Sequence, residues 1–139
     1  MKMRIKLLGI FIMAALFSAS CVSLKLNSAT KRKVYPGTPQ GREYVSYELS
    51  LTSSKGFSIK DLKLGDKPIE SYSMQNQKTL VYEDVKKNDF AAGNYKLFFK
   101  VYESGAVSDN DTITLTINQN GKDKTFRSAV VPLEALHKR

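Results

Sequence analysis

The sequence predicts an all-β protein that folds as a single antiparallel β-sandwich of about eight short strands. Apolar and polar residues alternate with a period of two in several segments, which is the pattern of half-buried strands. Clusters of Gly, Pro, Asn and Asp separate these segments at short intervals, as in sandwich domains. No long segment has the periodicity of a helix.

Residues 43–52 and 94–103 are the strongest predicted strands. The first has an apolar face of Val45, Tyr47, Leu49 and Leu51. The second has an apolar face of Tyr95, Leu97, Phe99 and Val101. On its other face Phe98 and Tyr102 interrupt the lysines, so this strand is predicted to be central, with both faces partly covered.

The remaining strands are shorter. They are predicted at residues 31–35 (an edge strand), 59–64, 68–72, 79–84, 111–118 and 124–131. Turns at 65–67 and at Asn120-Gly121 predict hairpins. Pro132 is expected to end the last strand, so the sandwich is expected at residues 31–131. The tail at residues 132–139 is expected to make one helical turn or to fray. A small barrel is the alternative architecture.

Residues 91–95 (Ala-Ala-Gly-Asn-Tyr) lead from a loop into the central strand. They resemble the tyrosine corner of immunoglobulin-like domains, in which the phenol hydrogen-bonds back to the loop backbone. Gly93 and Tyr95 fit that pattern, whereas Ala91 replaces the usual Asp, Leu97 replaces the usual Cys, and the chain has no Trp. The resemblance implies the broad immunoglobulin-like class and not an antibody-type domain.

Residues 1–20 have the layout of a secretory signal: a basic start, an apolar run at 7–17 and small residues at 18–20. The apolar run is shorter than the roughly 20 residues of a membrane span. Cys21, the single cysteine of the chain, follows directly, so no internal disulfide can form. The mature protein is therefore expected to be exported.

Small residues before a cysteine resemble the cleavage box of bacterial lipoproteins, in which the thiol and the new amine of the cysteine are acylated. Ser18 stands where Leu is usual, a departure tolerated in some bacterial groups, the Bacteroidetes among them. The resemblance implies lipidation of Cys21, with residues 22–30 as a polar tether. Ordinary signal cleavage, which would leave Cys21 as a free exported thiol, is the alternative.

The chain carries a net charge of +9, and its tightest basic cluster is Lys31-Arg32-Lys33. Export removes most nucleic-acid partners, so the cluster is interpreted as a solvated tether or edge strand near anionic lipid headgroups. The expected partners are a membrane, through the lipid, and an envelope protein or a glycan; no nucleic acid is expected.

The sequence predicts no catalytic residue, no metal and no cofactor. His137, the single histidine, lies in the tail, which is a poor scaffold for a triad or a zinc site. Paired carboxylates are the remaining enzymatic option, because glycosidases use them. The acidic candidates are Glu43, Glu48, Asp61, Glu70, Glu83, Asp84, Asp89, Glu103, Asp109, Asp111 and Asp123, each interpreted as solubilising charge.

Two further clusters are binding candidates. Asp109-Asn110-Asp111 has loop oxygens that suit Ca²⁺ but lacks the full ligand set, so a polar loop is favoured. Asp111-Thr112-Ile113 also resembles the short O-glycan acceptor motif of the Bacteroidetes. Five tyrosines outside the expected core could stack on sugars, although packing is favoured. They are Tyr35, Tyr44, Tyr72, Tyr82 and Tyr102.

The sequence therefore predicts a non-enzymatic cell-envelope lipoprotein with a binding or structural role. A carbohydrate-binding sandwich is the first alternative, supported by the tyrosines and the fold class. An envelope hydrolase with paired carboxylates is the second.

Overall fold

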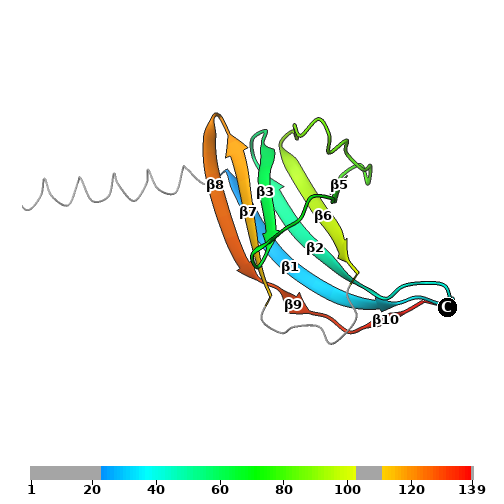
Figure 1. The fold of residues 1–139 in the computed structure, drawn as a ribbon. Helices are drawn as coiled ribbons and strands as arrows, with labels where there is room; N and C mark the ends of the chain where they lie inside the picture. Colours follow the sequence, from blue (N-terminus) through cyan, green and yellow to red (C-terminus); the bar gives the residue numbers. More distant parts are fainter. Residues whose placement is uncertain (1–22, 103–110, 139) are drawn as a thin grey trace, which may run out of the picture.

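The computed structural model describes residues 23–102 and 111–138, which form two packed β-sheets (Figure 1). The six-stranded sheet has the order β10-β1-β2-β6-β5, with β9 also paired to β1. Its strands are β1 (Leu24–Tyr35), β2 (Tyr44–Ser53), β5 (Ser73–Asn76), β6 (Gly93–Val101), β9 (Val131–Pro132) and β10 (Leu136–His137). The four-stranded sheet, β4-β3-β7-β8, consists of β3 (Ser58–Leu64), β4 (Lys67–Pro68), β7 (Thr112–Gln119) and β8 (Lys122–Ala129).

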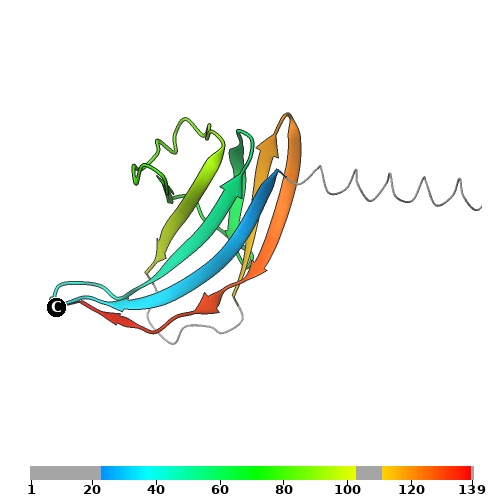
Figure 2. The same cartoon turned by 180° about the vertical axis from the view of Figure 1, so that it is seen from behind.

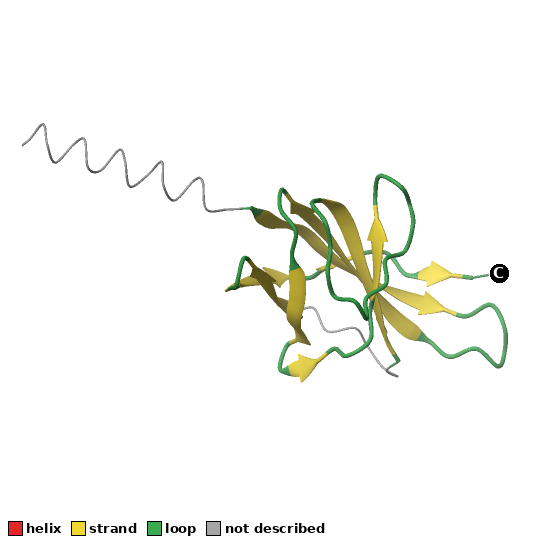
Figure 3. Ribbon diagram, turned by 90° about the horizontal axis from the view of Figure 1, so that it is seen from above, coloured by secondary structure: helices red, strands yellow, loops and turns green. Residues whose placement is uncertain are grey.

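The predicted antiparallel sandwich is confirmed. Figure 3 shows the two sheets as separate layers joined by loops. If the strands other than β4 are lettered in chain order, β1-β2-β6-β5 gives A-B-E-D and β3-β7-β8 gives C-F-G. This is the strand order of constant-type immunoglobulin domains. In the described part of the chain, no helix is long and apolar enough to cross a membrane.

The core lies between the sheets and is built from alternate residues of the long strands. The apolar faces predicted for residues 43–52 and 94–103 are both buried, as are Ile113, Leu115 and Ile117 of β7. Tyr47 stacks on Phe99, with ring centroids 4.7 Å apart, and Tyr95 packs edge-on against Phe57 and Phe90. As predicted, β6 is central, between β2 and β5.

The hydrogen bond expected from the tyrosine corner is present. Tyr95 is 1% exposed, and its hydroxyl donates to the backbone oxygen of Ala91 over 2.8 Å. Gly93 has φ of +156°, a conformation that residues with a Cβ rarely adopt. The corner begins β6, the fifth lettered strand, whereas in immunoglobulin domains it begins the sixth.

Residues 24–30 differ from the predicted tether, because they form the first half of β1. Leu24 and Ala29 are buried, and β1 pairs with β2 from Leu24 to Val34. The pairing register shifts between Leu26 and Ser28. This bulge adds one residue to the strand and interrupts the period of two, which explains why the sequence pattern missed the strand.

The C-terminal tail also differs from the prediction. It neither frays nor makes a helical turn over residues 131–138, but runs beside β1 as β9 and β10, both parallel to it (Figure 2). The Leu133 backbone nitrogen donates to the backbone oxygen of Lys31 over 2.8 Å, and the Lys138 backbone nitrogen donates to the backbone oxygen of Tyr35 over 3.0 Å. Residues 31–35 are therefore not an edge strand.

Residues 79–84 do not form the predicted strand. Leu80 has φ of +59°, which interrupts any extended run. The segment instead lies along the outer edge of β5: Asn76 donates to the Val81 oxygen over 2.9 Å, and Glu83 donates to the Met74 oxygen over 2.7 Å. Both edges of the six-stranded sheet are thus partly covered by short segments, which restricts pairing with another strand.

Candidate functional site

Cys21, the predicted lipidation site, lies outside the described residues, but the residue two positions later is firmly held. The Ser23 oxygen accepts a hydrogen bond from the Ser54 nitrogen over 2.8 Å, and the Ser23 hydroxyl donates to the Gln119 side chain. Gln119 is 4% exposed and also donates to Ser53 Oγ over 3.1 Å. The folded domain therefore begins almost directly after Cys21.

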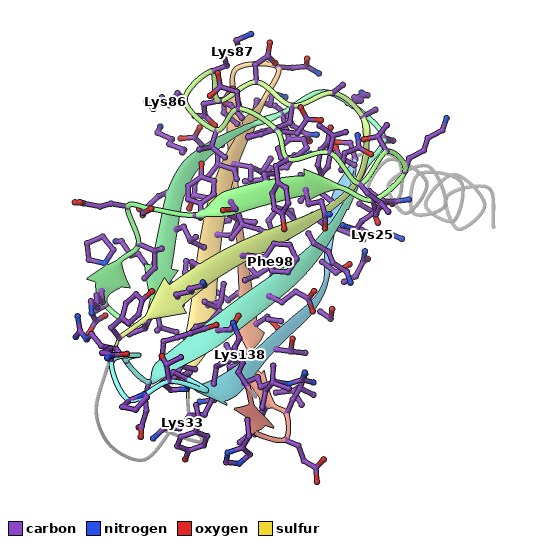
Figure 4. The ribbon with its side chains drawn as sticks, turned by 90° about the vertical axis from the view of Figure 1, so that its right-hand side faces the viewer. Lys25, Lys33, Lys86, Lys87, Phe98 and Lys138 are labelled. Carbon is purple, nitrogen blue, oxygen red and sulfur yellow. The ribbon has the colours of Figure 1, made fainter. Side chains whose placement is uncertain are left out.

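A groove crosses the outer face of the six-stranded sheet, from β5 to β10. It consists of two adjoining hollows that share Ser46 and Phe98. We call it the outer groove. Figure 4 shows this face, with Phe98 near its middle and Lys138 toward β10. The strands bend toward this side in Figure 1, so the face is concave.

The half of the outer groove next to β5 is aromatic. It is a hollow of about 570 Å³ lined by Ser46, Ser71, Tyr72, Ser73, Tyr82, Phe98, Phe99, Lys100 and Tyr102. Tyr82 is 61% exposed and Tyr102 is 50% exposed, so both present much of their surface to solvent. Burial raises the pKa of the Tyr72 hydroxyl above its ordinary value.

The half next to β10 is basic. Its lining residues are Thr30, Lys31, Arg32, Val34, Tyr44, Ser46, Glu48, Phe98, Leu133, Leu136 and Lys138. The Tyr44 ring has the ammonium of Lys100 4.7 Å from its centroid and that of Lys138 at 5.7 Å. These cation–π contacts place both charges beside the Tyr44 ring.

The charges of the outer groove are mostly positive. Glu48 is the single acidic residue among its lining residues, and the ammonium of Lys96 lies 3.3 Å from its carboxylate. The Arg32 Nε is buried and has no hydrogen-bond partner among the described residues. A buried donor without a partner is costly, and the guanidinium of Arg32 adds to the positive charge of the groove.

The structure brings together four of the five tyrosines proposed from the sequence, because Tyr44, Tyr72, Tyr82 and Tyr102 all line the outer groove. Tyr35 lies elsewhere and stacks on His137, with centroids 4.7 Å apart. No pattern in the sequence indicates that Arg32 and Lys138 share this face with the tyrosines. Lys138 reaches it only because the tail runs back along β1.

The basic cluster at residues 31–33 is divided by the alternation of β1. Arg32 lines the outer groove, while Lys31 is 1% exposed and points to the interior. The Lys31 ammonium lies 2.8 Å from Asp111 Oδ2, which also accepts a hydrogen bond from the Tyr47 hydroxyl over 2.7 Å. The interpretation of Lys31 as part of a solvated cluster is therefore wrong.

The contact between Lys31 and Asp111 also affects the acidic loop at residues 109–111, which the sequence offered as a candidate Ca²⁺ site. Asp111 is occupied by Lys31 and Tyr47, and Asp109 lies outside the described residues. Among the described residues, no group of three or more His, Cys, Asp and Glu side chains could hold a metal ion. Thr112, of the O-glycan motif, is exposed at the start of β7.

Several other acidic candidates also form ion pairs. Glu43 pairs with Lys33, Asp61 with Lys63, and Asp123 with Lys60. Hydrogen bonds from Lys60 and Asn118 lower the pKa of Asp123. These pairs lie at separate places on the strands and do not converge on the outer groove.

No protein-family model matches the chain, and the comparison with curated proteins gives no match. The geometry of the outer groove and the N-terminal sequence therefore carry the functional argument.

Proposed function

We propose that the protein is a non-enzymatic lipoprotein of the cell envelope, anchored by lipid on Cys21, which binds a ligand in the outer groove. One observation carries the anchor: the single cysteine follows an export-type signal and directly precedes the domain. Each buried methylene contributes about 0.8 kcal/mol of membrane affinity, so several acyl chains on one residue give a stable attachment.

The position of Ser23 supports this arrangement. An acylated Cys21 would lie two residues from a serine that is hydrogen-bonded into the β2–β3 and β7–β8 turns. The domain would then stand close to the membrane surface. The outer groove, on the face of the sheet, would stay open to the envelope.

Metabolic labelling with palmitate tests the anchor. We expect label on the wild-type protein and none on the Cys21→Ala variant, because the thiol is the acylation site. Lys122→Gln is the control, because it changes an exposed residue of β8 and keeps Cys21 and the residues before it. Wild-type protein without label, or with a free thiol at its mature N-terminus, would reject the anchor.

Carbohydrate binding is the second candidate, and the meeting of four tyrosines in one groove favours it. Exposed aromatic rings offer flat apolar faces with a polar edge, which suits the faces of sugar rings. The hydrolase alternative gains no support from this groove, since its mechanism needs two carboxyl groups and Glu48 stands alone among the lining residues.

A glycan array tests this candidate. We expect binding by the wild type and loss of binding when Tyr72, Tyr82 and Tyr102 are changed to Ala. Tyr35→Ala is the matched control, because Tyr35 stacks on His137 away from the groove. Absence of binding to every glycan would overturn carbohydrate recognition and leave the anchor to be judged by palmitate labelling.

A further inference from the structure

We infer that the outer groove takes an acidic saccharide chain, with sugar rings on its tyrosine half and acidic groups on its basic half. This inference rests on the proposed binding function and specifies the ligand. It depends on three features of the described residues: the ring faces, the balance of charge and the covered edges of the sheet.

The charge balance of the outer groove indicates that its ligand is an anion. Arg32, Lys100 and Lys138 line the groove, and the Arg42 guanidinium lies 5.2 Å from the centroid of the Tyr102 ring at its border. The carboxylate of Glu48 is matched by Lys96. Among the described residues that line the groove, the remaining cations have no acidic neighbour, so a ligand with carboxylate, sulfate or phosphate groups would complement them.

Arg32 is the most specific part of this site. Its side chain is part of the lining of the basic half, and guanidinium groups bind carboxylates and related anions through two parallel N–H donors. An acidic group of the ligand placed there would complement this positive charge. The preference for an acidic group should therefore depend on Arg32.

The covered edges distinguish a saccharide from an acidic peptide. Extended peptides commonly bind by adding a strand to an exposed sheet edge. Residues 80–83 lie along the edge of β5, while β9 and β10 pair with β1. The groove itself crosses the face of the sheet, where the backbone donors and acceptors are used by neighbouring strands. Ring stacking and charge attraction are the interactions that remain available to a ligand in the groove.

The inference is tested with an array that pairs uronate, sulfated and sialylated oligosaccharides with their neutral counterparts, alongside oligoglutamate. The probe is the full-length lipidated protein in detergent. We expect binding to acidic glycans at low salt, at least about tenfold weaker binding to the neutral counterparts, and weakening as salt screens the charges.

Variants locate the site. Arg32→Gln and Lys138→Gln should each weaken acidic-glycan binding about five- to tenfold, the usual effect of losing one charge-assisted contact. Lys122→Gln, an exposed lysine of the other sheet, is the matched control and should leave affinity unchanged. Thermal unfolding of each variant verifies the fold, and Arg32→Lys, which keeps the charge, should retain part of the affinity.

Each other outcome overturns the inference in a distinguishable way. Equal binding of acidic and neutral glycans would reject the acidic preference and keep carbohydrate binding. Binding to oligoglutamate alone, with the same loss in Arg32→Gln, would assign the groove to acidic peptides. If Lys122→Gln weakens binding as much as Arg32→Gln does, the protein attracts acidic ligands by its net charge and has no specific site.

Discussion

At the scale of single residues, the ion pair of Lys31 and Asp111 is a largely buried polar contact. The side chain of Lys31 is fully buried and that of Asp111 is 20% exposed. Removing one member of such a pair leaves a buried charge without compensation, whereas replacing both members removes the free-energy cost of burying charge. The pair joins β1 to the start of β7 and so links the two sheets.

Asp111→Asn should therefore lower the free energy of unfolding by about 3 kcal/mol, because Lys31 would be left as an unpaired buried cation. The double variant Lys31→Met/Asp111→Asn should recover most of this loss. Urea unfolding measures both changes. Asp123→Asn breaks the exposed pair with Lys60 and is the control, with little change expected. Equal effects at Asp111 and Asp123 would contradict the role of burial.

Tyr95 gives the protein a pH dependence in the alkaline range. Burial, and then the charge of Glu83, raises the pKa of its hydroxyl above 10.0. The unfolded chain thus loses this proton at lower pH than the folded chain does. The contribution to stability is complete below about pH 10 and is lost as the pH rises through the folded value.

Tyr95→Phe should show a smaller fall in unfolding free energy above pH 10 than the wild type. It should also be less stable at neutral pH by about 1 kcal/mol, because the hydrogen bond to Ala91 is lost. Urea unfolding from pH 7 to 11 measures both effects, and lysine titrations common to the two proteins cancel in the difference. Parallel curves for the two proteins would show that Tyr95 does not titrate as argued.

At the scale of elements, the C-terminal segment acts as a cover for β1. Its two short parallel pairings and the hydrogen bonds of Leu133 and Lys138 occupy backbone groups that would otherwise be exposed along a long strand. Exposed strand edges associate with one another. The segment also supplies Leu136 and Lys138 to the outer groove.

A chain lacking residues 133–139 should be less stable by about 2 kcal/mol or more, because it loses the backbone hydrogen bonds of Leu133 and Lys138 and the pairing of β10 with β1. It should also form dimers through the uncovered edge. Urea unfolding and light scattering measure these effects. Glu134→Gln, which keeps the segment and changes an exposed side chain, should behave as the wild type. A monomeric truncated protein of unchanged stability would rule out the covering role.

At the scale of the whole molecule, the short distance between Cys21 and the domain determines how an anchored protein would stand. The β7–β8 turn lies beside Ser23, whereas the loop at 36–43 follows the far end of β1. The 12 residues of β1 span about 40 Å at 3.3 Å per residue. One end of the sandwich should therefore face the membrane and the other the envelope.

Fluorophores on Lys122→Cys and Gln40→Cys variants, in liposomes with quencher-labelled lipid, test this orientation. We expect strong quenching at position 122 and weak quenching at position 40, because the first is near the anchor. A ten-residue Gly/Ser insertion after Val22 should reduce the difference. Equal quenching without the insertion would contradict a fixed orientation.

The sequence by itself determined the fold class and the buried faces of β2, β6 and β7, because alternation over eight or more residues is a local property of the chain. It also indicated that the four tyrosines of the groove lie outside the core, together with Tyr35, but did not place them on one surface. It missed the start of β1, where a bulge breaks the alternation, and it missed β5 and the segments that cover the edges, which are too short to show a period.

Only the tertiary structure decided which surface these residues share. Arg32 and Lys138 are far apart in the sequence, and they meet beside Tyr44 because the tail pairs with β1. It likewise decided that Lys31 is buried while its neighbour Arg32 faces the groove. Pairing between distant segments depends on backbone hydrogen bonds that every sequence offers, so the side-chain pattern alone does not specify the partner.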